Sequence, residues 1–340
     1  MDSEKKIVPE KTIVEWHDNK MLYQTVEGKP GISVGQYINP PPMLFTKDGH
    51  NLWDADMYKG RAAFLILSGP SFGDLLNSSI QIGDKTVSVR DSLKMPGFVT
   101  MSTNNSMRSF RTDLWVGVDS PNHFMKSIFL DPKVRKFIPF CHAESKLFDN
   151  EKWQETDILV SDCPNVCFFR RNDVFNHEQF LTENTINWGN SQDLGGGRTV
   201  MLAALRLLYY IGIRRIFLLG CDFNMSDTSK YHFEQDRTAH SMKNNNYTYE
   251  KMIERFALLK PVFERHGLEV FNCNPASKLQ VFDYVSYQDA YNMATCGLPL
   301  DWQSERTSGL YERMSLIKEE EKRKEKEKKK AQKPSFEIFD

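Results

Sequence analysis

The sequence predicts an α/β protein with a Rossmann-like, mostly parallel sheet and helices on both faces. Two observations predict this fold. Short, continuously apolar runs alternate with helical patterns, as in sheets that are buried on both faces. The clearest apolar runs also end in glycine or in polar residues. Around this sheet we expect an irregular N-terminal arm (residues 1–60), a core domain (61–300) and a charged helical or disordered tail (301–340).

Composition limits the classes of protein to consider. The 340 residues, 40% hydrophobic and 12% aromatic, suffice for a sizeable core and argue against wholesale disorder. A net charge of -1 excludes a generally basic surface for nucleic acid. Nine basic and five acidic residues lie between Lys318 and Lys333, which leaves a net -5 on the remainder. Such a tail is typical of a solvated helix or disorder, and could also bring the protein to an anionic partner.

The chain shows no sequence signal for a membrane span or a secretory route. No run approaches 18 apolar residues, and the first residues lack an apolar stretch. The six cysteines are scattered, and Cys163 and Cys167 lack a second pair at zinc-site spacing. We therefore expect reduced thiols and a cytoplasmic protein.

The expected N-terminal arm is interrupted by Pro30, Gly31 and three consecutive prolines, residues 40–42. Its aromatic residues favour packing against the core domain: Trp16, Tyr23, Tyr37 and Trp53.

The first clear strand is Ala62–Leu67, followed by Ser68-Gly69-Pro70-Ser71 and a short helix from Phe72 to Asn77. Ser71 is the expected N-cap of this helix. Gly69 would let the backbone approach a phosphate or ribose, and the helix N-terminus would attract an anion. The turn is neither a Walker A loop nor a dinucleotide fingerprint, because the further glycines and the lysine of those motifs are missing.

The next two strands, Phe98–Ser102 and Leu114–Val118, are followed by polar residues. Thr103-Asn104-Asn105 follows the first, and a segment that begins with Asp119 follows the second. Ligands of open α/β sheets bind outside the carboxyl ends of the strands, so these residues are candidates for ligand binding. Weaker patterns predict three more strands: Lys136–Cys141, Asp157–Val160 and Val166–Arg170.

The strongest segment runs from Gly195 to Phe223. The loop Gly195-Gly196-Gly197-Arg198-Thr199 exposes backbone N–H groups beside a cation, which suits a carboxylate or phosphate. An apolar helix follows from Val200 and ends at Gly212. The strand Arg215–Leu219 then ends in Gly220-Cys221-Asp222-Phe223.

A long polar segment follows, from Tyr231-His232-Phe233-Glu234 to His240-Ser241. Segments of this length inside a compact domain are often functional lids. His240 could act as a general base at neutral pH, or could simply be exposed. The expected helix Tyr249–His266, the strand Leu268–Asn272 and the sequence Asn274-Pro275-Ala276-Ser277 complete the core.

The order of these pieces resembles the bacterial lipooligosaccharide sialyltransferases and the related Maf flagellin-glycosylation and 6-hydroxymethylpterin pyrophosphokinase-like group. The likeness spans about Ala62 to Tyr287, roughly two thirds of the chain. It depends on the ordered set of motifs, since each motif alone is common.

The resemblance implies roles for particular residues. Donor-site residues would be Gly69, Pro70, Ser71, Asn104 or Asn105, the segment from Gly195 through Gly196, Gly197 and Arg198 to Thr199, and the pair Asn274 and Ser277. Tyr231 would contact the departing phosphate, and His240 would be the catalytic base. The family has a second tyrosine after Asp222-Phe223, where this chain has Asn224.

The implied function is that of a glycosyltransferase. It would move a sugar from a CMP-sugar-like nucleotide donor to an acceptor hydroxyl, without a required metal, in a nucleotide-sugar-binding domain that forms homo-oligomers by analogy. A glycan or a modified nucleobase is the expected acceptor class. Two alternatives stay open. One is an Mg²⁺-dependent pyrophosphokinase that uses ATP and the carboxylates of Asp119, Asp222 and Asp227. The other is a nucleotide-binding protein without turnover, which Asn224 favours.

Overall fold

The computed structural model describes residues 13–17, 20–24, 30–31, 43–47, 56–172, 175–187, 199–225, 231–233, 239–298 and 321–327. The chain divides into two compact units, Met1–Gly297 and Leu298–Asp340. In the second unit, residues 321–327 form a helix whose side chains are exposed. None of the described helices is both long and apolar enough to cross a membrane.

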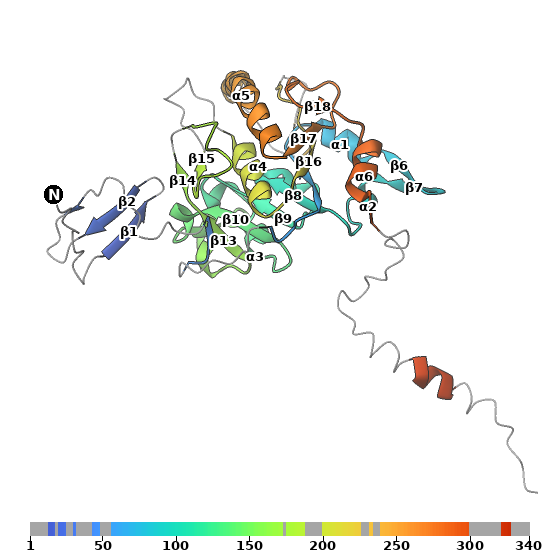
Figure 1. Cartoon of the computed structure of the whole chain (residues 1–340). Coiled ribbons are helices and arrows are strands. Elements are labelled where there is room, and N and C mark those ends of the chain that lie inside the picture. The colour runs from blue at the N-terminus through green and yellow to red at the C-terminus, as the bar shows by residue number, and fades with distance from the viewer. Residues whose placement is uncertain are drawn as a thin grey trace, which may run out of the picture. The chain divides into compact units, whose positions relative to one another are not determined.

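The core of the first unit is a nine-stranded sheet in the order β18-β17-β16-β5-β8-β9-β10-β13-β4 (Figure 1). Eight strands are mutually parallel, and β4 pairs antiparallel with β13. The predicted mostly parallel α/β fold is therefore confirmed. The strands are β4 (Leu44–Phe45), β5 (Ala62–Ile66), β8 (Val99–Thr103), β9 (Leu114–Val116), β10 (Arg135–Pro139), β13 (Val166–Phe169), β16 (Arg215–Leu219), β17 (Glu269–Asn272) and β18 (Asp283–Tyr284).

The remaining elements surround this sheet. The helices are α1 (Ser71–Leu76), α2 (Val89–Ser92), α3 (Lys126–Leu130), α4 (Val200–Tyr210), α5 (Ala239–Arg265) and α6 (Tyr287–Thr295). Short 3₁₀ helices are η1 (Asn104–Arg108), η2 (Pro121–His123), η3 (Phe140–His142) and η4 (Val160–Asp162). Small separate sheets join β1 (Ile13–His17), β2 (Lys20–Gln24) and β3 (Pro30–Gly31); β6 (Ser79–Ile82) and β7 (Lys85–Ser88); β11 (Lys146–Asp149) and β12 (Gln154–Leu159); and β14 (Arg171–Asn172) and β15 (Ile186–Asn187).

The strand order reverses direction beside β5. The chain first moves outward from β5 through β8, β9, β10 and β13, and then returns so that β16 pairs with the other side of β5. At such a switch point the loops that leave neighbouring strands diverge and leave a crevice at the carboxyl ends of the strands. The fold therefore predicts a crevice where β5, β8 and β16 end.

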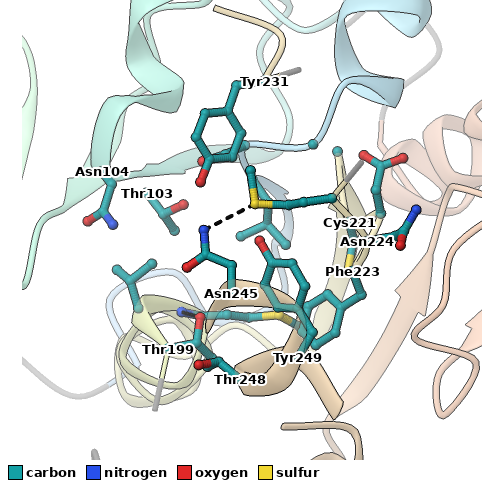
Figure 2. Close-up of a pocket in the computed structure, with 18 of the residues that line it drawn as sticks. Thr103, Asn104, Thr199, Cys221, Phe223, Asn224, Tyr231, Asn245, Thr248 and Tyr249 are labelled. Carbon is teal, nitrogen blue, oxygen red and sulfur yellow. Dashed lines mark hydrogen bonds between the residues drawn. The ribbon is translucent and has the colours of Figure 1, made fainter. Parts of the chain in front are cut away.

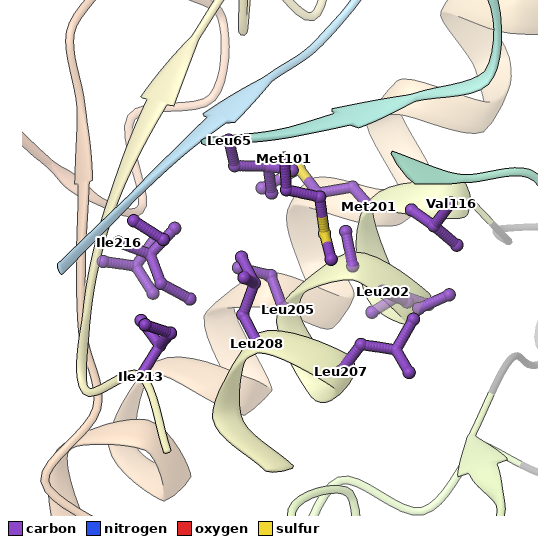
Figure 3. Packing of buried hydrophobic residues seen from close by; sticks show 14 of the residues in the cluster. Leu65, Met101, Val116, Met201, Leu202, Leu205, Leu207, Leu208, Ile213 and Ile216 are labelled. Carbon is purple, nitrogen blue, oxygen red and sulfur yellow. The ribbon is translucent and has the colours of Figure 1, made fainter. Parts of the chain in front are cut away.

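Alternation along the strands supplies two cores, one on each face of the sheet. On one face, Leu65 of β5 and Ile216 of β16 pack with the leucines of α4, such as Leu205 (Figure 3). Buried residues of α5 belong to the same cluster, which explains why α4 is apolar on most sides. On the other face Phe64 lies against rings from neighbouring elements: Phe98, Phe217 and Tyr287.

Gly212 ends α4 as predicted. Its φ is +101°, and a Cβ there would lie 2.7 Å from the Cα of Asp56. The residues before β5 close the helix, because Tyr58 N–H donates to the carbonyl of Ile211 (2.7 Å). Glycine is required at this position both by the backbone conformation and by the close approach of this segment.

Several expected elements differ in the structure. The N-terminal arm is not irregular throughout: it forms β1, β2 and β3, and β4 extends the main sheet. Pro30, expected as a breaker, lies in the edge strand β3, where no partner needs its missing N–H. Tyr37 and Trp53 lie outside the described residues. The strand predicted at Asp157–Val160 belongs to β12, which pairs with β11 and not with the main sheet.

Helix α5 begins ten residues before the predicted start at Tyr249. The added turns contain three consecutive asparagines, which have low intrinsic helix propensity. Tertiary contacts support them: Met225 N–H donates to Asn246 Oδ1 and Asn246 Nδ2 donates to the Met225 carbonyl, both at 2.8 Å. His240 therefore lies on the first turn of a helix and not in a loop.

The packing of α4 predicts a matched pair of leucine substitutions. Leu205→Ala removes a fully buried side chain and should lower the free energy of unfolding by about 2–5 kcal/mol. Leu258 of α5 is 49% exposed, so Leu258→Ala should change the free energy of unfolding by less than about 0.5 kcal/mol. Chemical denaturation measures both, and similar losses in the two variants would contradict this assignment of the core.

Candidate functional site

A pocket of about 320 Å³ lies at the carboxyl ends of β5, β8, β9 and β16 (Figure 2). The N-terminus of α4 and one side of α5 complete its walls. Eight predicted site residues line it: Gly69, Pro70, Asn104, Asp119, Thr199, Asp222, Asn224 and Tyr231. Its volume is that of a small-molecule site, and its place is the switch point of the sheet.

Asp222 joins the loops that follow three strands of the sheet. Its Oδ2 accepts hydrogen bonds from the Ser71 hydroxyl (2.9 Å) and the Ser71 N–H (3.3 Å). Its Oδ1 accepts one from Asn274 Nδ2 (2.7 Å). Burial raises the pKa of Asp222, and the hydrogen bonds from Ser71 and Asn274 act in the opposite direction. Both carboxylate oxygens are engaged within the protein, so the geometry favours loop fixation over Mg²⁺ ligation.

The same contacts explain Gly69. A Cβ on Gly69 would lie 1.7 Å from Asp222 Oδ2 and 2.5 Å from the carbonyl of Gly220. The glycine is needed for packing between the two loops, whatever a ligand requires. The prediction that Ser71 is the N-cap of α1 is wrong, because Pro70 holds that position and the Ser71 hydroxyl donates to Asp222.

Asn104 is the most strained polar residue of the pocket. Its φ is +48°, in the left-handed region, and its carbonyl accepts a hydrogen bond from Trp115 Nε1 (2.7 Å). Its side-chain Oδ1 is buried and has no hydrogen-bond partner among the described residues. An acceptor left in this state costs free energy that a ligand donor would recover. Asn105, the other candidate, lies outside the lining and donates to the carbonyl of His123 (3.2 Å).

The N-terminus of α4 opens onto the pocket. Thr199 caps the helix, with its hydroxyl accepting from Met201 N–H (3.4 Å), and both residues line the pocket. The described lining contains no lysine, arginine or histidine. The helix dipole and its N–H groups are therefore the positive element for an anion on this wall. Gly195, Gly196, Gly197 and Arg198 lie outside the described residues.

Tyr231 reaches into the pocket toward the side where Asn104 and Asn245 lie (Figure 2). Its ring stacks on Phe233 with centroids 5.1 Å apart. His232, the residue between them, does not line the pocket; its Nε2 lies 2.9 Å from the carbonyl of Leu67 and its Nδ1 lies 2.7 Å from Ser109 Oγ. Burial lowers the pKa of His232 to about 4.

Helix α5 supplies three lining residues that the sequence reasoning missed: Asn245, Thr248 and Tyr249. Tyr249 lies over the ring of Phe223, whose φ of +53° marks a second strained position. The spacing of these three residues is the signal that was available, because positions i, i+3 and i+4 share one helix face.

The predicted base and two other candidates lie outside the lining. His240 is exposed on the first turn of α5, with Nε2 3.0 Å from Asn244 Nδ2. Ser277 is buried and donates to the carbonyl of Cys221 (2.5 Å), so it supports the loop after β16. Asn274 has the same supporting role through Asp222. The described residues contain no group of three or more His, Cys, Asp and Glu side chains placed to hold a metal ion.

Fold and site together define an α/β protein with a ligand pocket at the switch point of its sheet. No protein-family model matches the chain, and no curated protein matches it. Among solved structures, the chain is similar to a Maf glycosyltransferase from Magnetospirillum magneticum AMB-1, with a TM-score of 0.38 and 13% identity. The match covers 75% of this chain and 39% of that one, so this chain corresponds to less than half of that protein. A likeness this distant says nothing about substrate or reaction.

The buried imidazole of His232 predicts a pH dependence of stability. Its folded pKa of about 4 is below the value of about 6.5 in the unfolded chain. The unfolded state therefore takes up the proton first as the pH falls, so the contribution is complete above about pH 6.5 and is lost toward pH 4. Among the described residues, the groups placed against the ring are Phe72, Phe233, the Leu67 carbonyl and the Ser109 hydroxyl, and none of these is charged.

Urea denaturation between pH 7.5 and pH 4.5 measures this effect against a His232→Gln variant. The wild type should lose more stability than the variant over this range, because glutamine does not titrate. Parallel losses in the two proteins would contradict the buried neutral state of His232.

Proposed function

We propose that the protein is a glycosyltransferase that moves a sugar from a nucleotide-activated, CMP-sugar-like donor to an acceptor hydroxyl. One observation carries the proposal: Asn104 Oδ1, which has no hydrogen-bond partner in the described part of the chain, the hydroxyl of Tyr231 and the N-terminus of α4 surround one pocket at the switch point. The order of motifs along the chain supports the same reaction independently of this geometry.

The donor nucleotide would bind through the backbone N–H groups at the N-terminus of α4 and through uncharged side chains of the pocket. Its phosphate suits the N–H groups of α4 after Thr199, where Arg198 would add a cation. The Oδ1 of Asn104 needs a hydrogen-bond donor, which an amino group of a nucleobase or a ribose hydroxyl supplies. Gly69 and Pro70 form the wall beside Asp222.

In the transfer, the acceptor oxygen forms a bond to the anomeric carbon while the bond from that carbon to the phosphate oxygen breaks. The hydroxyl of Tyr231 would donate to the departing phosphate, which carries the electron pair away. His240 would take the acceptor proton. It lies five residues before Asn245 on α5, about 7.5 Å closer to the N-terminal end of the helix, so the acceptor would enter from that end.

The competing pyrophosphokinase needs carboxylates that hold Mg²⁺ against the ATP phosphates. Asp119 and Asp222 are the carboxylates in the described lining, and Asp222 is engaged by Ser71 and Asn274. Asp227 lies outside the described residues. The glycosyltransferase is therefore the better-supported proposal, while the acceptor class, the oligomeric state and the cytoplasmic location stay predictions.

A thermal-shift screen with CMP, CDP, UDP, GDP, ADP and ATP, each with and without Mg²⁺, tests the donor class. CMP without metal should raise the Tm, because a ligand of the native state stabilises it by mass action. A shift only with ATP and Mg²⁺ would favour the pyrophosphokinase. No shift with any nucleotide would contradict the proposal.

Asn104→Gly and Asn104→Asp sharpen this screen. Both residues tolerate the positive φ, so backbone strain should not lower the Tm of the unliganded proteins. The Gly variant loses the acceptor, and its affinity for CMP should fall about tenfold to a hundredfold, which corresponds to one buried hydrogen bond. The Asp variant keeps an acceptor oxygen and should retain more of the affinity. Equal affinities in wild type and Asn104→Gly would remove Asn104 from the site.

Turnover tests the two proposed catalytic residues. Release of CMP from CMP-N-acetylneuraminic acid, with lactose or water as the acceptor, serves as the assay. Tyr231→Phe should lower kcat by about 10²-fold, as for loss of one donor to a developing anion. His240→Ala should lower lactose-dependent transfer by about 10²–10⁴-fold, whereas Lys243→Ala, a matched change of an exposed residue near the same end of α5, should not. Unchanged transfer in His240→Ala would reject it as the base.

A further inference from the structure

The segment Tyr231–Phe233 has no regular secondary structure, yet it presents Tyr231 to the pocket. A short irregular segment has no helix or sheet ladder of its own to fix the direction of a side chain. Its orientation must therefore come from side-chain contacts with the core. Most of the contacts that the structure gives to this segment converge on His232.

His232 is bonded on both sides of its ring. Nε2 lies 2.9 Å from the Leu67 carbonyl at the end of β5, and Nδ1 lies 2.7 Å from the hydroxyl of Ser109 after η1. The backbone is bonded as well: His232 N–H donates to the Ser68 carbonyl (3.4 Å), and the Ser109 hydroxyl donates to the His232 carbonyl (3.0 Å). Leu67 and Ser68 themselves line the pocket.

The ring also occupies a closely fitting apolar site. It lies edge-to-face against Phe72 of α1, with centroids 5.0 Å apart. A Cβ on Gly73 would lie 3.3 Å from the Cβ of His232, so α1 approaches this residue closely. Three core elements, β5, η1 and α1, thus hold one side chain of the segment.

These partners define the protonation of the ring. A carbonyl only accepts, so Nε2 carries the proton and donates to Leu67. Ser109 has a single hydroxyl hydrogen, which it donates either to Nδ1 or to the carbonyl of His232. The neutral imidazole thus has a donor for the Leu67 carbonyl, and His232 is not among the residues that line the pocket.

We propose that His232 is a positioning residue that sets the hydroxyl of Tyr231 for the departing phosphate. The inference rests on the proposed function, in which Tyr231 donates to that phosphate. Tyr231 lines the pocket and its neighbour His232 does not, so a ring held in the core by its contacts with Leu67 and Ser109 restricts the tyrosine before substrate arrives. Such prior restriction raises kcat more than it changes substrate affinity.

His232→Phe and His232→Gln test the role. Phenylalanine keeps the packing against Phe72 and loses both hydrogen bonds, whereas glutamine keeps a donor for the Leu67 carbonyl. His232→Phe should lower kcat for CMP release by about 10–100-fold with KM changed less than about threefold. His232→Gln should recover most of this loss.

The double variant Tyr231→Phe/His232→Phe separates positioning from a structural role. If His232 acts through Tyr231, the double variant should be no slower than Tyr231→Phe alone. Tyr287→Phe, which removes a buried 2.8 Å hydrogen bond to Ser92 and lines no part of the pocket, is the control and should keep its kcat. If His232→Phe does not fold, Ser109→Ala takes its place in the same double-mutant cycle, because that variant removes the partner of Nδ1.

The outcomes are distinguishable. Additive losses in the double variant, or a loss confined to KM, with wild-type turnover intact would overturn the positioning role alone. Absence of CMP release and of CMP binding in the wild type would overturn the proposed function, and the catalytic meaning of His232 with it.

Discussion

The carboxylate of Asp222 is the interaction on which the geometry of the pocket depends. Through Ser71 and Asn274 it ties together the loops that leave β5, β16 and β17. Burial opposes its charge, and three hydrogen bonds offset that cost. Loops at a switch point diverge by topology, so a shared anchor is what keeps them at one separation. The missing Cβ of Gly69 is a consequence, because any larger residue would occupy the position of Asp222 Oδ2.

The sequence predicted the central strands well because a parallel sheet covered on both faces needs continuously apolar strands. Ala62–Leu67 and Arg215–Leu219 agree with β5 and β16 to within a residue. The carboxyl ends of the strands also supply most of the residues that line the pocket. Asn104 follows β8, and Asp222 lies in the loop after β16. The ordering of strands is a tertiary property, however, and nothing in the residues 44–45 indicated an added edge strand, β4.

The parts of the site that were missed have a different physical origin. Helix α5 extends through an asparagine-rich stretch because Asn246 bonds to the backbone of Met225, a contact between segments that a local pattern does not contain. That extension carries Asn245 and Tyr249 into the pocket and places His240 on an exposed turn. The role of His232 could not be predicted from the sequence, because its burial against Phe72 and its hydrogen bond to Leu67 depend on the fold.

The pocket combines features that are costly for the protein in the absence of a ligand. Asn104 and Phe223 both hold a positive φ, and the Oδ1 of Asn104 is buried without a partner among the described residues. A core selected only for stability would remove such positions, because each can cost on the order of 1–3 kcal/mol. They persist here beside the N-terminus of α4. The described lining contains no basic side chain that would bind an anion in place of that N-terminus. The proposed nucleotide donor would meet these groups with an anionic phosphate at one end and hydrogen-bond donors at the other.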